Sequence, residues 1–356
     1  MDSLLATGTR STEAIVLAGS YQWTASTFDR LRPRPLLPVA ESPLIEFVLD
    51  WLKSGGLERA VICGNGSTEV LRSQLEAEPH MTEKHRRPKL SFHEDRSPRG
   101  AAGCVKDAAG LSDAPTLLVA DGTSIPAFDL SELLRHHRVS GADLTIVAQR
   151  DSLHPAGIYV FERRVLDAVP ATSFQDIKET LIPRLYRSGR KIEVFRVETV
   201  SPRVLNASTY VALNHWMVRR MVSEPHPTAW ISPDAVVLGP VVFGEGVRVH
   251  AGATIVGPSS VGAGSVVEAD AIVARSVIWK DCTIRSRAMV DHCILADGVD
   301  VEAASVVSNA IRTRPPSRPA DRAARGFDAE FAGLPTRFRQ RVTELRTACL
   351  PRTFRV

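Results

Sequence analysis

The residues best placed to do chemistry in the first half of this chain come at the ends of apolar segments. Gly19 closes the run Glu-Ala-Ile-Val-Leu-Ala-Gly, and Asp121 directly follows the apolar run 116–120. Glycine has no Cβ atom, so a ligand can approach its backbone closely. A carboxylate in a turn either serves a ligand or caps the next segment by accepting hydrogen bonds from backbone N–H groups. Both interpretations of Asp121 stay open, and both positions are candidates for a ligand site.

Strands and helices are predicted to alternate through residues 1–220. Strands are expected at 13–19, 59–63, 90–93, 116–120, 144–148 and 157–161, and helices at 43–56 and 131–140. This alternation predicts an α/β domain with a doubly wound, mostly parallel sheet. In such sheets ligands bind beyond the carboxyl ends of the strands, which is where Gly19 and Asp121 are expected.

Short segments spread over residues 13–310 follow the pattern of a known family. They are Leu17-Ala18-Gly19, Pro33–Val39, Pro43-Leu44-Ile45, Gly100–Gly103, Ala156–Phe161, Asp176–Glu179 and Leu181-Ile182-Pro183. In order and spacing they resemble the sugar-1-phosphate nucleotidyltransferases (NDP-sugar pyrophosphorylases), which join a nucleoside triphosphate to a sugar 1-phosphate and release pyrophosphate. The resemblance implies a Rossmann-like nucleotidyltransferase domain at residues 1–220, with a nucleotide or a sugar phosphate as its ligand.

The resemblance also implies roles for single residues. Those implied for nucleotide binding are Leu17, Ala18, Gly19, Gly100, Gly103 and Asp121, and those implied for sugar binding are Gly157, Lys178 and Glu179. Structural alternatives remain for several of them. Gly100 and Gly103 can simply shape a loop. Lys178 and Glu179 can lie on the solvated face of a helix that Pro183 is expected to end.

The chain departs from the family pattern where the phosphates should bind. In the family a glycine-rich turn offers its backbone N–H groups to the phosphates, and an Arg in that turn grips the leaving pyrophosphate. Here only Gly19 remains of that turn, and Thr24 replaces the Arg. A lysine that neutralises developing charge is replaced by Arg34, whose planar guanidinium is not equivalent to a compact ammonium group. Arg34 is the candidate catalytic residue, and Arg30 and Arg32 are candidate substitutes at the phosphates.

The metal-binding positions are also changed. The family holds Mg²⁺ with two aspartates, and the ion bridges the phosphates. Counting along the chain puts the first position on Thr123, and alignment on Tyr210 puts the second on Arg203. A guanidinium has only donors, so Arg203 cannot ligate Mg²⁺. Asp121 remains the one candidate metal ligand, and Mg²⁺ is expected as a cofactor only if the chain is catalytic.

A bulky apolar residue recurs every six positions in the second half. From Ile231 the series runs through Val237, Phe243, Val249, Ile255, Val261, Val267, Val273 and Trp279, and after each comes a small or β-branched residue four positions later. After Trp279 the register is expected to slip to Ile284, and later again to Leu295. This period predicts a left-handed parallel β-helix over residues 228–310, with three short strands in each coil and an apolar column inside.

Such coils also occur in acyltransferases and in homo-oligomers. Acyl transfer would need a His as general base, and His250 and His292 are the histidines within the coils. Both can equally be surface decoration. A stack of coils has open ends, so we expect either self-association or a cap.

Composition and charge limit the remaining classes. Five cysteines without a Cys-x-x-Cys pair favour reduced thiols in a cytoplasm. No apolar run approaches the roughly 20 residues that cross a bilayer, so no membrane is expected as a partner. Residues 311–356 hold eleven Arg and no Lys against four acids. Their apolar residues recur at helical spacing, which predicts a docked helix, with a polyanion-binding arm as the alternative. Nucleic acid is therefore not an expected partner.

Two functional hypotheses follow. In the first, the chain is a pyrophosphorylase of polysaccharide precursor metabolism with a rearranged phosphate site and weakened chemistry. In the second, it is a non-catalytic member that binds a sugar nucleotide or sugar phosphate and regulates or scaffolds an active nucleotidyltransferase homologue. The substituted positions favour the loss of chemistry.

Overall fold

The computed structural model describes residues 12–19, 28–77, 87–150, 155–198, 203–221 and 225–314. All of them belong to one compact unit, Met1–Pro315. The segment 20–27, where the family's glycine-rich turn was expected, lies outside the described residues. So does the expected helix of the Arg-rich tail.

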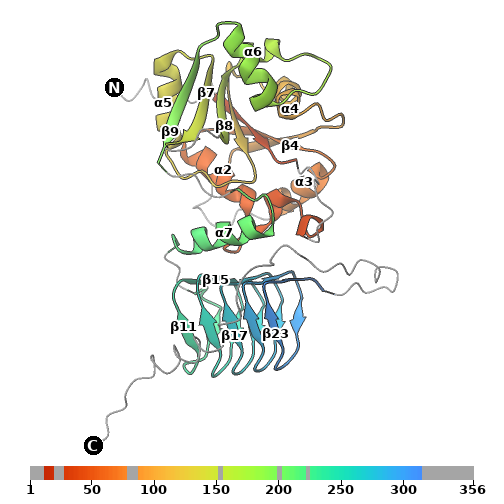
Figure 1. Ribbon diagram of the computed structural model, residues 1–356, viewed down its shortest axis with the longest axis vertical. Coiled ribbons are helices and arrows are strands. Elements are labelled where there is room, and N and C mark those ends of the chain that lie inside the picture. The colour runs from red at the N-terminus through yellow and green to blue at the C-terminus, as the bar shows by residue number, and fades with distance from the viewer. Residues whose placement is uncertain are drawn as a thin grey trace, which may run out of the picture. The chain divides into compact units, whose positions relative to one another are not determined.

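A mixed sheet forms the first domain (Figure 1). Within the described residues it has seven strands in the order β5-β4-β1-β6-β8-β7-β9. Their bounds are Thr12–Leu17 (β1), Arg59–Gly64 (β4), Lys89–Glu94 (β5), Thr116–Asp121 (β6), Leu144–Gln149 (β7), Pro155–Glu162 (β8) and Ile192–Val197 (β9). β8 runs antiparallel to β6 and β7, whereas the other neighbours are parallel. The predicted mostly parallel sheet is confirmed.

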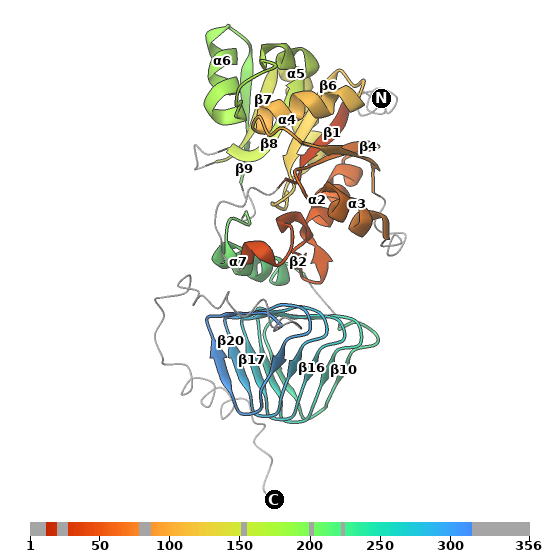
Figure 2. The ribbon, with the colours of Figure 1, turned by 90° about the vertical axis from the view of Figure 1, so that its right-hand side faces the viewer.

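Helices cover both faces of this sheet (Figure 2), because each strand alternates its side chains between two cores. In β1, Ala14 and Val16 belong to one core and Ile15 to the other. The helices of the first core are α2 (Leu44–Ser54), α3 (Thr68–Ala77) and α5 (Leu130–Ser140), and those of the second are α4 (Ala101–Ala108) and α6 (Ile182–Arg187). No helix in the described ranges is both long and apolar enough to cross a membrane.

Shorter elements connect these layers. They are the 3₁₀ turns Phe28–Arg30, Arg34–Leu36, Ala109–Leu111 and Arg163–Ala168 and the two-residue strands Pro38–Val39 (β2) and Ser42–Pro43 (β3). The 12-residue helix α7 (Ala207–Val218) follows β9 along the chain.

Lys178 and Glu179 lie in a single π-helical turn, Ile177–Leu181, which passes directly into α6. The expectation that Pro183 ends this helix is wrong. Pro183 lies in the first turn of α6. A proline is tolerated there because its missing N–H group would have no partner inside the helix in any case.

The second domain is a parallel β-helix with three strands in each coil (Figure 1). Its faces, within the described residues, are five-stranded parallel sheets in the orders β10-β13-β16-β19-β22, β11-β14-β17-β20-β23 and β12-β15-β18-β21-β24. The bounds are Trp230–Ile231 (β10), Val236–Leu238 (β11), Val241–Phe243 (β12), Arg248–Val249 (β13), Thr254–Val256 (β14), Ser259–Val261 (β15), Val266–Val267 (β16), Ile272–Ala274 (β17), Val277–Ile278 (β18), Thr283–Ile284 (β19), Met289–Asp291 (β20), Ile294–Leu295 (β21), Asp300–Val301 (β22), Val306–Ser308 (β23) and Ile311–Arg312 (β24). β24 therefore continues the coils past the expected end at residue 310.

The six-residue period is confirmed, but two of its positions differ from the prediction. Ile278, not Trp279, is paired with Val261 and lies in the apolar column. The first register slip therefore falls between Val273 and Ile278, and Trp279 faces outward to helix α7. Val237 is 39% exposed, because it lies on the edge strand β11 and no earlier coil covers it.

Helix α7 packs against the coils. Its Tyr210 is fully buried, and the Tyr210 hydroxyl donates a 2.5 Å hydrogen bond to the carbonyl of Pro38. Val218 of α7 forms a small apolar cluster with Ala40 and Val242. The β-helix is thus contacted by two parts of the sheet domain. One is the segment that holds Ala40, and the other is helix α7.

Candidate functional site

The carboxyl ends of β1 and β6 meet beside β8, as the parallel sheet requires. Asp121 ends β6 directly opposite Leu17, the last residue of β1. Gly157 of β8 has φ +82°, and a Cβ atom added there would lie 3.1 Å from the Cβ of Asp121. The structure therefore brings together three residues that the sequence singled out separately, and glycine is needed at position 157 for this close approach.

Asp121 forms an ion pair with Arg203. Nη2 of Arg203 donates to Oδ2 of Asp121. The other carboxylate oxygen, Oδ1, accepts from the backbone N–H of Thr123 at 2.8 Å and from its hydroxyl at 2.6 Å. The backbone N–H of Val204 donates to the carbonyl of Thr123, which holds the Arg203 segment beside the turn. The capping interpretation of Asp121 is thus confirmed, and its second oxygen has a cationic partner.

These contacts do not fit a Mg²⁺ site of the family's kind. Magnesium requires several oxygen ligands, usually including carboxylates. At this edge Thr123 and Arg203 occupy the expected aspartate positions, and both oxygens of Asp121 already have partners. Within the described ranges no group of three or more His, Cys, Asp or Glu side chains could hold a metal ion. The cation beside Asp121 is a guanidinium of the chain itself.

Of the three predicted sugar-binding residues, Gly157 lies next to this pair, through its close approach to Asp121. Burial raises the pKa of the Tyr159 phenol; the charge of Asp176 raises it further, whereas Arg203 lowers it. These effects place Tyr159 of β8 within electrostatic reach of both residues. Oδ1 of Asp176 caps the π turn by accepting from the backbone N–H groups of Lys178 (2.6 Å) and Glu179 (3.0 Å). The Lys178 and Glu179 side chains are exposed.

The loop of Gly100 is fastened to the segment that leads into Asp176. Gly100 has φ +82°, and a Cβ atom there would lie 2.5 Å from the carbonyl oxygen of Gln175. That carbonyl accepts from the N–H of Ala102 at 3.0 Å, and the Gln175 N–H donates to the carbonyl of Arg99. A Cβ atom on Gly103 would lie 2.8 Å from the Cβ of Arg99. The structural reason for both glycines is thus close packing, which holds the loop predicted to bind the nucleotide against the segment that leads into Asp176.

Asn65 is a residue of this edge that the sequence reasoning missed. A Cβ atom on Gly19 would lie 3.0 Å from Oδ1 of Asn65, and this buried oxygen has no hydrogen-bond partner among the described residues. Nearby, the Gly66 N–H donates to Glu94 at 2.6 Å and lowers the pKa of that carboxyl. The signal was present, because Gly64-Asn65-Gly66 is a turn directly after a buried strand. Ala18 joins the two strand ends by donating its N–H to the carbonyl of Cys63.

The three candidate arginines do not share one environment. Arg32 forms an ion pair with Asp297 of the β-helix, and its guanidinium lies over the Trp279 ring, 5.2 Å from the centroid. The charge of Arg32 is thus paired with a carboxylate of the coils, and a role for Arg32 at the phosphates stays a prediction. Arg34 is half-buried in the turn Arg34–Leu36, and Arg30 is exposed.

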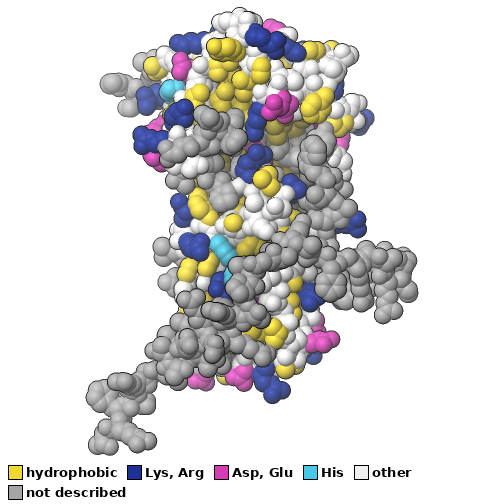
Figure 3. Space-filling model, viewed as in Figure 1, with side chains coloured by type: hydrophobic (Ala, Val, Ile, Leu, Met, Phe, Trp, Pro, Cys, Tyr) yellow, Lys and Arg dark blue, Asp and Glu magenta, His cyan; other side chains and the backbone are white. Residues whose placement is uncertain are grey.

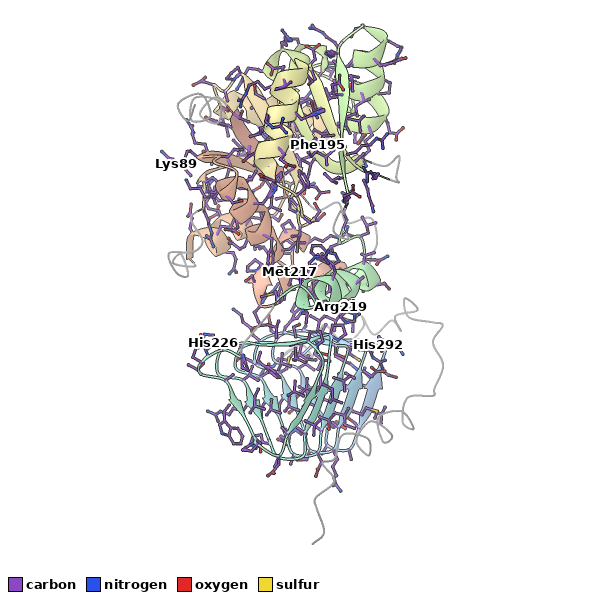
Figure 4. All side chains as sticks on the ribbon, turned by 90° about the vertical axis from the view of Figure 1, so that its left-hand side faces the viewer. Lys89, Phe195, Met217, Arg219, His226 and His292 are labelled. Atoms are coloured by element: carbon purple, nitrogen blue, oxygen red, sulfur yellow. The ribbon has the colours of Figure 1, made fainter. Side chains whose placement is uncertain are left out.

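The two coil histidines have structural contacts. Nδ1 of His292 lies 2.9 Å from Oδ1 of Asp291, which also binds the guanidinium of Arg275. His292 is at a coil corner on the side of helix α7, which contains Met217 and is followed by Arg219 (Figure 4). The His250 ring packs against the Trp230 indole, with centroids 5.6 Å apart. A role for either histidine in acyl transfer stays a prediction.

Charge is not concentrated on the face seen in Figure 3. Among the described residues, Lys and Arg side chains are scattered over both domains there and do not gather in one basic patch.

Comparisons with known proteins match both halves of the chain. The nucleotidyl transferase family matches residues 13–156, and the GMPPB C-terminal domain family matches residues 223–315. The chain is 24% identical over 321 residues to a mannose-1-phosphate guanylyltransferase of Mycobacterium tuberculosis, covering 75% of this chain and 84% of that protein. It is 22% identical over 362 residues to a UTP–glucose-1-phosphate uridylyltransferase of Synechocystis, covering 83% and 92%. It is also 22% identical over 320 residues to a glucose-1-phosphate thymidylyltransferase of Streptomyces antibioticus, covering 80% and 87%.

Proposed function

The chain belongs to the sugar-1-phosphate nucleotidyltransferase family, and from that membership we propose that it binds a sugar nucleotide or sugar phosphate without turning it over. The observation that carries the proposal is the Asp121–Arg203 ion pair. It occupies the position where relatives of this kind need carboxylates for Mg²⁺. In this proposal the ligand is held, but the described residues of this edge offer no group of carboxylates for the metal ion that would neutralise charge in phosphoryl transfer.

The size of that missing contribution supports a loss of turnover. A bound metal ion contributes several kcal/mol to stabilising the charge of a transferring phosphoryl group. An arginine on the transferring phosphate contributes about 10³–10⁵ in rate. Here the expected aspartate positions are Thr123 and Arg203, and the expected arginine position is Thr24. Replacements elsewhere in the chain would have to restore both contributions.

The ligand is proposed from the fold and from the relatives' names. The three relatives transfer different nucleotides, a guanylyl, a uridylyl and a thymidylyl group, onto mannose 1-phosphate or glucose 1-phosphate. The shared chemistry is a pyranose joined to a nucleoside diphosphate. We therefore propose this class of ligand and leave the base open, with a role in polysaccharide precursor metabolism.

The biological role that fits a binder without turnover is regulation or scaffolding. The first and last coils of the β-helix end in edge strands, which can pair with another chain. We propose that a homo-oligomer, or a complex with an active homologue, forms through these coils. Light scattering that returns the mass of a single chain, alone and with an active homologue, would count against this part.

A pyrophosphate-release assay tests the proposal. The purified chain is incubated with Mg²⁺, each of the common nucleoside triphosphates and either mannose 1-phosphate or glucose 1-phosphate. The M. tuberculosis relative serves as the positive control. We expect titration calorimetry to detect binding of a sugar nucleotide and the assay to detect no turnover. Robust turnover that Asp121→Ala abolishes would instead establish the working enzyme with a rearranged site.

A further inference from the structure

Among the described residues, Arg203 contacts one acceptor, and at least one of its donors is unused. A guanidinium carries five N–H donors in a planar fork. Among the described residues, Asp121 is the acceptor that Arg203 contacts, and Nε of Arg203 is buried without a partner. The Arg203 side chain is 34% exposed, so the guanidinium is not closed off from solvent as a whole. A partly exposed arginine with an unused donor at the ligand edge of the sheet is suited to receive an anion.

The contact with Asp121 is single rather than two-pronged, and the geometry explains why. The Nε and Nη2 groups of an arginine point the same way and commonly bind both oxygens of one carboxylate. Here Oδ1 of Asp121 is taken by the N–H and hydroxyl of Thr123, so only Oδ2 is left for Arg203. Because Thr123 occupies Oδ1, Arg203 forms a hydrogen bond to Asp121 through Oδ2 alone. An enclosed donor without an acceptor destabilises the folded chain, and a ligand oxygen that accepts from it would remove that cost.

Local charge permits an anion at this position. A Mg²⁺ ion held by two carboxylates has no net charge at the site, yet its open coordination positions still bind phosphate. The pair of one guanidinium and one carboxylate also has a net charge of zero. As with the metal, the attraction for a phosphate then comes from cationic groups that face the ligand, while the carboxylate keeps the cation in place.

The backbone that follows Arg203 is tied to the turn that carries Asp121. The Val204 N–H is tied to the carbonyl of Thr123 at 3.1 Å, directly after Arg203. Gly157 allows the backbone of β8 to lie against Asp121. A preorganised donor binds an anion with less ordering cost than a mobile surface side chain.

We propose that Arg203 takes the place of Mg²⁺ as the receptor for the diphosphate of the sugar nucleotide, so that the chain binds its ligand without metal. This inference rests on the proposed function, since it names how that ligand is recognised. It predicts that Mg²⁺ does not tighten binding, because the ion has no carboxylate cage at the site and competes with Arg203 for the phosphate oxygens.

Titration calorimetry with GDP-mannose, UDP-glucose and dTDP-glucose tests this inference on the full chain, in EDTA and in millimolar Mg²⁺. We expect binding in EDTA that Mg²⁺ leaves unchanged or weakens. We expect Arg203→Gln to weaken it about tenfold or more, as for the loss of a charge-assisted hydrogen bond. Arg135→Gln, an exposed arginine on α5, is the matched control and should bind as the wild type does.

A double variant distinguishes two roles of Arg203: binding the phosphate of the ligand, or only pairing with the carboxylate of Asp121. Arg203→Gln alone leaves the Asp121 carboxylate without its cation, and that charge could itself repel the ligand. Asp121→Asn with Arg203→Gln removes both charges, and the change at Asp121 keeps the size of that side chain. If Arg203 receives the phosphate, the double variant stays about tenfold weaker than wild type. Recovery of wild-type affinity in the double variant would overturn the inference, and so would binding that requires Mg²⁺.

The two proposals fail in different ways. If none of the three sugar nucleotides binds with or without Mg²⁺, the proposed function itself is contradicted. If one of them binds only with Mg²⁺, or binds equally well to Arg203→Gln, the binding function stands and the role of Arg203 is wrong. Thermal unfolding of each variant establishes that a loss of binding is not a loss of folding.

Discussion

The indole nitrogen of Trp279 donates a 2.9 Å hydrogen bond to the hydroxyl oxygen of Tyr210. The rings meet edge to face, at an interplanar angle of 89° with centroids 6.4 Å apart. Tyr210 belongs to helix α7 and Trp279 to a corner of the coils, and both are buried. This bond joins the α/β part of the chain to the β-helix.

Removing that bond should lower stability measurably. Trp279→Phe deletes the indole N–H, while the Tyr210 hydroxyl still donates to Pro38. One lost hydrogen bond costs about 0.5–1.5 kcal/mol in the free energy of unfolding. The matched control is Trp230→Phe, because Trp230 is 51% exposed and should change stability by less than about 0.5 kcal/mol. Urea unfolding followed by circular dichroism measures both, and equal midpoints would contradict the prediction.

Glu41 should make stability depend on pH. Its carboxylate accepts a 2.8 Å hydrogen bond from the N–H of Ala263 in the coils. Burial raises the pKa of Glu41, and the hydrogen bond from Ala263 only partly opposes this. For an acid with a raised pKa in the folded state, the contribution to stability is complete below the unfolded pKa near 4.5 and is lost as pH rises through the folded pKa.

The side chain of Glu41→Gln can accept the same hydrogen bond and carries no charge at any pH. The variant therefore does not lose stability as the pH rises. We expect the melting temperature of Glu41→Gln minus that of the wild type to be near zero at acidic pH and to become positive towards pH 7. Glu76→Gln, at an exposed position of α3, should show no such trend. Calorimetric melting across this pH range measures the difference, and a flat difference for Glu41→Gln would refute the argument.

Gly100 should not tolerate a side chain. Alanine there must adopt φ +82° and place its Cβ atom 2.5 Å from the Gln175 carbonyl oxygen. With ψ at 172°, this backbone conformation is essentially restricted to glycine, and it costs about 1–3 kcal/mol for a residue with a Cβ atom. We expect Gly100→Ala to lose at least about 2 kcal/mol in the free energy of unfolding once the contact with the backbone is added.

Gly110→Ala is the control, because no atom lies within 4 Å of a Cβ atom added there. Urea unfolding of the two variants gives the comparison. If both are as stable as the wild type, the loop does not depend on close packing against Gln175.

Restoring acidic residues at the altered positions should restore metal binding. Thr123→Asp with Arg203→Asp frees Asp121 and supplies two further carboxylates. We expect Mg²⁺ to raise the melting temperature of this double variant by a few degrees, since a ligand that binds only the folded state stabilises it. The wild type should show no such shift.

Thr123→Asn with Arg203→Asn matches these changes in size without adding charge, and it should not respond to Mg²⁺. The same melting experiment with Ca²⁺ distinguishes a magnesium site from a general effect of divalent ions. A wild type stabilised by Mg²⁺ as much as the acidic variant would show that Arg203 does not exclude the metal.

Much of the fold could be predicted from local patterns. The strands of the sheet and the helices 44–54 and 130–140 follow from apolar runs and their spacing, because burial on one or two faces imposes that spacing. The coils follow from the six-residue period. The register slip near Trp279 could not be located in the same way, because Val277, Ile278 and Trp279 are consecutive apolar residues and each could face the column.

The sequence, set beside the family pattern that it resembles, predicts that Thr123 and Arg203 stand where that family carries its metal-binding aspartates. That prediction needs only the order of residues along the chain and the pattern of the family. Only the tertiary structure decided that Arg203 pairs with Asp121 and that Arg32 pairs with Asp297 of the coils. The partners in these pairs are far apart in sequence, and no local pattern specifies them. They meet because the sheet, helix α7 and the stacked coils bring distant segments to the same place, where opposite charges then stabilise each other.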